Sequence, residues 1–176
     1  AGGAMSAVEH VMDHKADGAF AAVRPPGHHA VRSHQMGFCL FNNAAIAARF
    51  ALANYDIKRI LIIDFDVHHG NGTQEAFYSE SQVLYYSTHE YPWYPFTGPA
   101  EETGRGAGEG YTVNVPLEAG LGDNEYLQVF NEVLVPVARR FQPDLVLVSA
   151  GYDAHWQDTI SNMTLTTTGF ARMTKI

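Results

Sequence analysis

The sequence predicts an α/β domain built around a parallel sheet. Ile60–Phe65 contains a continuous run of Ile and Leu, which is typical of a central strand with both faces buried. Stretches of strand character also alternate with stretches of helical character along most of the chain, as in a parallel sheet with crossover helices. Because ligands of open α/β sheets bind beyond the carboxyl ends of the strands, we expect the functional site at that edge.

The amino-terminal part of the chain predicts a helix, a strand and a rigid loop. Ser6–His14 has helical character, with Ser6 as its capping residue. Ala19–Val23 predicts a strand, which leads into a segment at 24–30 whose two prolines and glycine restrict the backbone. Side chains in that segment would therefore be held in place.

The middle of the chain supplies the central strand and its neighbours. Asn43–Asn54 is rich in alanine and predicts a crossover helix, while Thr73–Tyr78 predicts a short helix and Val83–Ser87 a second strand. Glu90–Gly110 is rich in proline and glycine and predicts a long loop, and such loops are often functional. Three aromatic residues of this loop would either wall a substrate channel or pack the loop down, and the sequence favours neither: Trp93, Tyr94 and Phe96.

The last third of the chain continues the alternation. Tyr111–Val115 predicts a strand, and Asn124–Phe141 predicts an amphipathic helix with a kink at Pro136. Leu145–Val148 predicts a third buried strand, and Thr168–Ile176 predicts a helix that has only begun where the chain stops. We therefore expect a fragment of a longer domain.

Composition excludes several classes of protein. The 176 residues suffice for one domain, and no apolar run is long enough to cross a bilayer. A formal charge of −8 argues against a nucleic-acid surface and is compatible with a cationic substrate. The one cysteine, Cys39, excludes an internal disulfide and favours a reducing compartment, which we expect to be the cytoplasm. Nothing in the sequence predicts the oligomeric state.

Metal-binding side chains follow the predicted strands. Asp64, Asp66 and His68 are two residues apart and so leave an extended chain on the same side. The sequence Gly70-Asn71-Gly72 then predicts a tight loop with positive φ angles and close backbone approach. Asp153 stands just past the third strand, so Asp66, His68 and Asp153 are candidate ligands of one divalent ion.

Three protein ligands and an open position are typical of a catalytic metal site, whereas a closed structural zinc site has four cysteine or histidine ligands. The oxygen-rich set suits zinc and also iron(II). Two adjacent imidazoles, His28 and His29, follow the prolines at 25 and 26 and are candidate proton acceptors beside a metal-activated water. The constellation predicts metal-assisted hydrolysis.

Four motifs in this order resemble the histone deacetylase family, including its bacterial deacetylase-like and acetylpolyamine amidohydrolase members: RPPGHHA, GFCLFNN, DFDVHHGNGTQ and SAGYDAH. The resemblance runs from about Arg24 to Asp158. It implies a three-layer α/β/α sandwich with a mainly parallel sheet, the arginase–deacetylase fold. Residues 1–176 would then be a single partial catalytic domain, truncated at both ends.

The resemblance also implies a role for each site residue. The zinc ligands would be Asp66, His68 and Asp153. His29 would be the general base and then the general acid, with Asn71 as its partner, and His28 would act electrostatically, held by Asp64. Since a carboxylate makes an imidazole more basic than an amide does, His29 should be the less basic of the two. The resemblance places substrate contacts at Phe38, Tyr94 and Gly151, and a potassium or sodium site at Asp64, Asp66, His68, Ser87 and Thr88.

The chain departs from the family pattern in three respects. It lacks the glycine-rich motif that carries the transition-state tyrosine, a stabilising group of a kind that contributes about 3 kcal/mol. It also lacks the family's amino-terminal strands and acidic substrate-gripping loop. Phe96 stands where the family usually has a glycine. We therefore expect little activity from this chain alone.

The leading hypothesis is zinc-dependent deacetylation of acetylated lysine in a peptide, with a small N-acetylated amine such as an acetylpolyamine as the alternative substrate. Neither nucleic acid nor a membrane is an expected partner. A binuclear manganese ureohydrolase would need further carboxylates and a tighter spacing than DAHWQD offers. A catalytically dead protein that binds acyl-lysine is the third reading, although both histidines and all three expected ligands are present.

Overall fold

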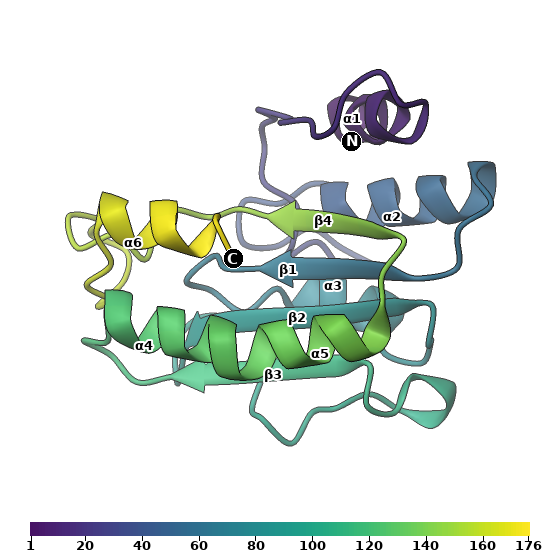
Figure 1. The fold of residues 1–176 in the computed structure, drawn as a ribbon. Coiled ribbons are helices and arrows are strands. Elements are labelled where there is room, and N and C mark those ends of the chain that lie inside the picture. Colours follow the sequence, from purple (N-terminus) through teal and green to yellow (C-terminus); the bar gives the residue numbers. More distant parts are fainter.

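The computed structural model describes all 176 residues and contains one four-stranded sheet with the strand order β3-β2-β1-β4 (Figure 1). The strands are β1 (Ile60–Asp64), β2 (Val83–Glu90), β3 (Thr112–Leu117) and β4 (Leu145–Ser149). Every pairing is parallel, and Asp64 stands in register with Ser87 of β2 and Ser149 of β4. The prediction that β1 is a central parallel strand is therefore confirmed, and the carboxyl ends meet at one edge.

Helices cover both faces of the sheet. On one face lie α1 (Gly2–Met12), α2 (Asn43–Asn54) and α3 (Asn71–Phe77), and on the other lie the segments that follow β3. Those segments are α4 (Asp123–Val129), the π-helical turn η2 (Phe130–Leu134), α5 (Val135–Phe141) and, after β4, α6 (Thr167–Met173). A short 3₁₀ turn, η1 (Gly106–Gly108), interrupts the long loop before β3. The result is the predicted α/β/α sandwich.

The two cores follow from the alternation of side chains along β1. Ile60 and Ile62 pack with α1, α2 and α3, whereas Leu61 packs with α4, η2 and α6. All three side chains are at most 2% exposed, and burying an aliphatic side chain of this size contributes about 1.5–3 kcal/mol. A continuous apolar run is therefore what this position in the sheet requires.

Two predictions for the amino-terminal segment are corrected. The first helix begins at Gly2 rather than Ser6, so Ser6 does not cap it. Its first turn forms because Ala4, like Val8, packs against α2, and this tertiary contact outweighs the weak helical propensity of the glycines. Ala19–Val23 is not a strand, because it pairs with no other strand and leaves Phe20 78% exposed to solvent.

The later elements occur where they are expected, with changed boundaries. Asn43–Asn54 is confirmed, and Asn42 caps this helix by accepting a hydrogen bond from the Ala45 amide at 3.0 Å. The helix expected at Thr73 begins two residues earlier at Asn71, and β2 continues past Ser87 to Glu90.

The long helix after β3 is interrupted by a π turn directly before Pro136, the residue at which a kink is predicted. The Val135 amide donates to the carbonyl of Phe130, five residues back, so the helix widens into a π turn. Pro136 follows immediately and has no N–H to donate.

The prediction that the strand at Leu145–Val148 is buried is wrong. β4 is the outer strand of the sheet, and Val146 and Val148 on it are 47% and 53% exposed.

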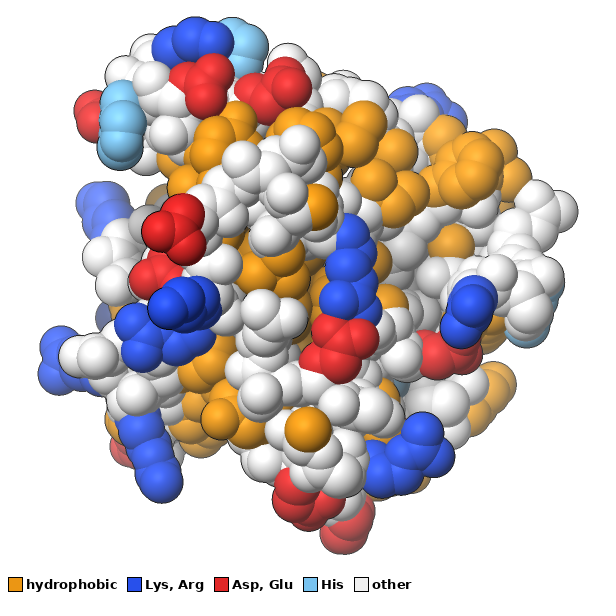
Figure 2. Space-filling view, turned by 90° about the vertical axis from the view of Figure 1, so that its right-hand side faces the viewer, with side chains coloured by type: hydrophobic (Ala, Val, Ile, Leu, Met, Phe, Trp, Pro, Cys, Tyr) orange, Lys and Arg blue, Asp and Glu red, His pale blue; other side chains and the backbone are white.

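The end of the molecule at which the strands begin shows basic and acidic side chains interspersed among apolar ones (Figure 2). No helix of the structure has the length and apolar character needed to span a bilayer.

Candidate active site

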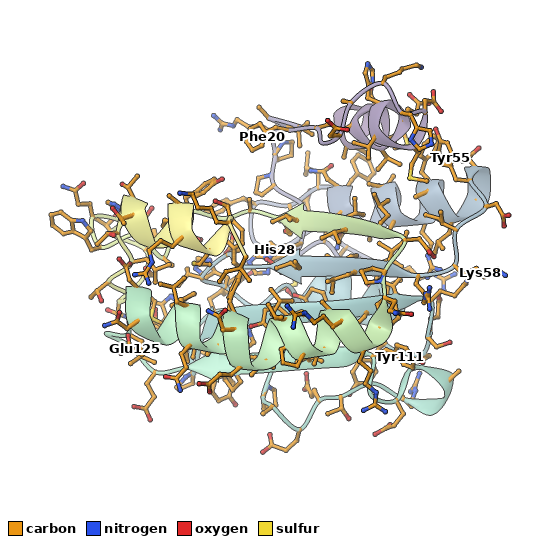
Figure 3. All side chains as sticks on the ribbon, viewed as in Figure 1. Phe20, His28, Tyr55, Lys58, Tyr111 and Glu125 are labelled. Atoms are coloured by element: carbon orange, nitrogen blue, oxygen red, sulfur yellow. The ribbon has the colours of Figure 1, made fainter.

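The polar residues singled out in the sequence gather at the carboxyl edge of the sheet. Asp66 and His68 follow β1 directly, and Asp153 follows β4, the neighbour of β1. His28 comes from the loop at 24–30 and lies beside the carboxyl end of β1 (Figure 3). Residues far apart in sequence therefore meet because parallel strands end together.

Asp66, His68 and Asp153 form a cluster whose ligand atoms all lie within 4.8 Å of one another. His68 Nδ1 is 3.0 Å from Asp66 Oδ1 and 2.9 Å from Asp153 Oδ2. Two backbone amides orient the carboxylates, because the His68 amide donates to Asp66 and the Val67 amide donates to Asp153, each at 2.9 Å. One nitrogen and two oxygens thus converge on one point, as in a three-ligand site for a divalent cation.

The environment of this cluster favours positive charge. Burial lowers the pKa of His68, but hydrogen bonds to Asp153 and Asp66 outweigh burial and raise that pKa to about 10. The two carboxylates therefore stabilise a proton where a metal cation would also be stabilised.

His28 lies between two carboxylates. Its Nδ1 is 3.0 Å from Asp64 Oδ2, and its Nε2 is 3.6 Å from Asp66 Oδ2. Burial lowers the pKa of His28, but the charges of Asp64 and then Asp66 outweigh it and raise the pKa to about 9. The two carboxylates therefore favour the protonated form of His28.

His29 lies 4.0 Å from His28 between ring centroids but has the opposite character. Its Nδ1–H donates to Asn71 Oδ1 at 2.8 Å, which leaves Nε2 as an acceptor. Burial and then the charge of His28 lower the pKa of His29 to about 3, so His29 is neutral. The pKa values of the pair have the order expected from the sequence, since His29 is the less basic.

The aromatic loop contributes one ring to the site. The Tyr94 ring stands edge-on to His29, with centroids 5.1 Å apart, and to His68, with centroids 6.0 Å apart. Trp93 instead donates from Nε1 to the Ile160 carbonyl and so fastens the loop to its neighbour. Trp93 therefore packs the loop down, which is one of the two alternatives, and a substrate contact at Tyr94 stays a prediction.

Two aromatic residues near the site, Phe38 and Phe96, are exposed and have a left-handed backbone conformation. Phe38 has φ +62° and is 90% exposed, and Phe96 has φ +65° and is 74% exposed. Phe96 thus adopts a left-handed conformation, which glycine adopts more readily than other residues.

Three glycines lie directly against site side chains. A Cβ at Gly37 would overlap the His29 ring, one at Gly70 would overlap Asp64, and one at Gly151 would overlap Asp66. The predicted close backbone approach is therefore present, and Gly151 borders a candidate ligand. The predicted positive φ angles after β1 are wrong, since Gly70 has φ −78°, and the close contact alone requires glycine there.

Asp64, Ser87 and Thr88 lie buried beneath the cluster. Asp64 Oδ2 accepts from Tyr85 at 3.2 Å and pairs with His28, but Asp64 Oδ1 and Thr88 Oγ1 have no hydrogen-bond partner. The sequence gives no sign that Tyr85 belongs to the site, because aromatic residues are common in strands. Unsatisfied buried oxygens are costly and are a feature of cation sites.

Comparison with known proteins places this arrangement in one family. The family model described as "Histone deacetylase domain" matches residues 1–176. "Histone deacetylase 14, chloroplastic" of Arabidopsis thaliana is 53% identical over 156 residues, which are 89% of this chain and 37% of that protein. A "Probable deacetylase" of Archaeoglobus fulgidus is 48% identical over 98% of this chain and 48% of that protein. The chain thus spans about half the length of these relatives, or less.

A solved structure agrees. The "Crystal Structure of HDA15 HD domain" superposes with a TM-score of 0.95 at 46% identity, covering 98% of this chain and 51% of that one. The expected arginase–deacetylase fold is confirmed by this match. With a family model that spans every residue of the sequence, the chain belongs to the histone deacetylase domain family.

Proposed function

We propose that this chain carries the metal-binding and proton-transfer residues of a metal-dependent deacetylase that hydrolyses the amide of acetylated lysine. The observation that carries this proposal is the placement of a neutral imidazole beside the cluster. The ring centroids of His29 and His68 are 5.8 Å apart, and Nε2 of His29 is free to accept a proton. Family membership supports hydrolysis of acetylated substrates in general.

The donor set fits a divalent ion, because the convergent imidazole and carboxylates already stabilise positive charge. Asp66, His68 and Asp153 would hold zinc, or iron(II), which when bound acidifies a water and polarises the acyl carbonyl. Asp64 Oδ1 and Thr88 Oγ1 support a potassium or sodium ion near Ser87, since they are buried without partners.

His29 and His28 divide the proton chemistry. Nε2 of the neutral His29 takes the proton of the attacking water and then delivers it to the leaving amine. Its tautomer is fixed because Nδ1–H donates to Asn71. Asp64 and Asp66 hold the pKa of His28 above that of His29, so His29 is the better proton acceptor and His28 would stabilise the negative charge that develops on the acyl oxygen.

Tyr94, Phe38 and Gly151 would contact the substrate, with the Tyr94 ring set beside His29. The charge of −8 suits both a lysine-rich peptide and a cationic acetylated polyamine, which remains the alternative substrate. A cytoplasmic location also remains a prediction.

Metal content and deacetylase activity, measured together, test this proposal. The samples are this chain and any longer polypeptide that contains it, assayed with an acetyl-lysine peptide and an acetylated polyamine. We expect one zinc per chain, activity that a chelator removes and zinc restores, and slow turnover by this chain alone. Stoichiometric zinc without turnover of either substrate by the longer polypeptide would instead favour a protein that binds acyl-lysine without hydrolysing it.

Asn71→Asp is expected to move the acidic limb of the kcat/KM pH profile to higher pH. A carboxylate in place of the amide stabilises the protonated form of His29 and raises its pKa. Because the base must be unprotonated, activity at low pH is lost first. Asn124→Asp, an exposed change of the same kind, is the control and should leave the profile unchanged. A profile of Asn71→Asp that coincides with that of the unmodified protein would contradict the role of His29.

A further inference from the structure

A second pair of histidines lies buried outside the set to which the proposed mechanism assigns roles. His69 and His89 are at most 1% exposed, and their ring centroids are 4.7 Å apart. His69 follows the candidate ligand His68, and His89 belongs to β2. Two strands thus present adjacent imidazoles to the same place.

Each imidazole has both nitrogens engaged, and the partners define its tautomer. His89 Nε2–H donates to the Gly98 carbonyl at 2.8 Å, so its Nδ1 accepts from the Ser87 hydroxyl at 2.9 Å. His69 Nε2–H donates to Gln74 Oε1 at 3.0 Å, so its Nδ1 accepts from the Thr97 hydroxyl at 2.7 Å.

The Gln74 side chain is held by further contacts. Its Nε2 donates to Glu102 at 2.5 Å, and its Oε1 also accepts from Asn114 at 2.7 Å. The amide cannot flip without losing these bonds, so the acceptor presented to His69 is fixed. Both imidazoles are therefore neutral, rigid hydrogen-bonding groups.

Both histidines fasten the same short segment of the aromatic loop. Thr97 and Gly98 are neighbours, and each is bonded to one of the two rings. Gly98 packs so closely that a Cβ there would lie 2.6 Å from His69 and 2.7 Å from the His89 Nε2. This contact is closer than real Cβ atoms make, so the segment is pressed onto the pair.

Tyr94 lies three residues before Thr97 in this segment and faces the reaction centre through His29 and His68. The Phe96 amide donates back to the Trp93 carbonyl at 2.6 Å, which closes the intervening turn around Tyr94. One hydrogen-bonded turn therefore connects Thr97 and Gly98 to the Tyr94 ring.

We propose that His69 and His89 are positioning residues that hold the Tyr91–Gly98 segment so that Tyr94 borders the substrate site. The expected effect on substrate binding rests on the proposed deacetylase function. The claim that the two histidines fasten the loop does not, because it concerns only the contacts of that loop.

His89→Phe keeps an aromatic ring and removes the donor to Gly98, whereas His89→Gln keeps an N–H near the position of Nε2. Thr97→Val removes only the hydroxyl that reaches His69, and Thr97→Ser restores it. These half-buried Thr97 variants keep the test available if His89→Phe does not fold. His10→Phe, an exposed change on α1, is the matched control.

The kinetic test uses a zinc-loaded longer polypeptide that contains this chain, with an acetyl-lysine peptide as substrate. For His89→Phe and Thr97→Val we expect KM to rise about tenfold, because small displacements of substrate-positioning groups are costly, with zinc content unchanged. The Gln and Ser variants should recover most of this loss. In a Tyr94→Ala background the same substitutions should add less than about twofold, since they act through Tyr94. Equal effects with and without Tyr94 would overturn the proposal.

Amide hydrogen exchange separates this proposal from the deacetylase function. Exchange within residues 91–98 should be faster in His89→Phe and Thr97→Val than in the unmodified chain, and near normal in the Gln, Ser and His10→Phe proteins. This outcome supports the positioning role even if no acetylated substrate is turned over. Unchanged exchange in both disruptive variants would refute it, whatever the activity.

Discussion

Asp153→Ala is expected to abolish stoichiometric zinc binding. Asp153 supplies one of three convergent ligand atoms, and its Oδ2 lies 2.9 Å from the His68 nitrogen in the same cluster. Loss of even an outer-shell partner of a ligand typically costs about 10–100-fold in affinity, so loss of a direct ligand should cost more. Zinc content after dialysis against metal-free buffer measures the effect, and the unmodified chain should retain one ion.

The control must separate ligand loss from unfolding. Asp153 Oδ1 accepts from the Val67 amide, and leaving that buried donor unpaired costs about 1–3 kcal/mol. Asp153→Asn preserves an acceptor for this amide while removing the charge, so it should fold and still bind zinc poorly. Asp158→Ala removes an exposed carboxylate in the same loop and should keep full occupancy. Full zinc occupancy in Asp153→Ala would remove Asp153 from the ligand set.

His29→Ala is expected to lower kcat by about 10²–10⁴-fold, the range typical of general acid–base catalysis. The substitution removes the imidazole of lower pKa, and His28, whose pKa is raised by Asp64 and Asp66, is a poor replacement as a base. Zinc content should stay normal because His29 lies outside the three-ligand cluster. Turnover of an acetyl-lysine peptide by a longer polypeptide that contains this chain is the measurement.

His34→Ala, an exposed change five residues from the nearest member of the pair, is the control and should leave kcat unchanged. A kcat for His29→Ala equal to that of the unmodified protein would exclude His29 as the base. A loss of zinc together with activity would show that His29 supports the metal instead.

The central strand could be predicted from the sequence because its apolar residue pattern matches its buried position in the fold. Ile60–Ile62 is apolar without interruption and lies between two helical layers. The candidate ligands were predictable for a related reason, since Asp66, His68 and Asp153 each follow a strand that ends at the same edge.

The elements that could not be predicted depend on neighbours distant in sequence. Ala19–Val23 has strand propensity but no strand beside it, and β4 is apolar although one of its faces meets solvent. The His69 and His89 pair was also beyond the sequence, because only the folded loop brings Thr97 and Gly98 to these rings.

The glycines at 37, 70 and 151 have a consequence for the genetics of this domain. None of them offers a functional group, yet each leaves room for one of the side chains on which the chemistry depends. In a saturation-mutagenesis screen for activity, even a methyl group at these positions should behave as a null allele, on a par with loss of a catalytic residue. Positions that do not tolerate substitution should therefore include these glycines as well as the residues with reactive side chains.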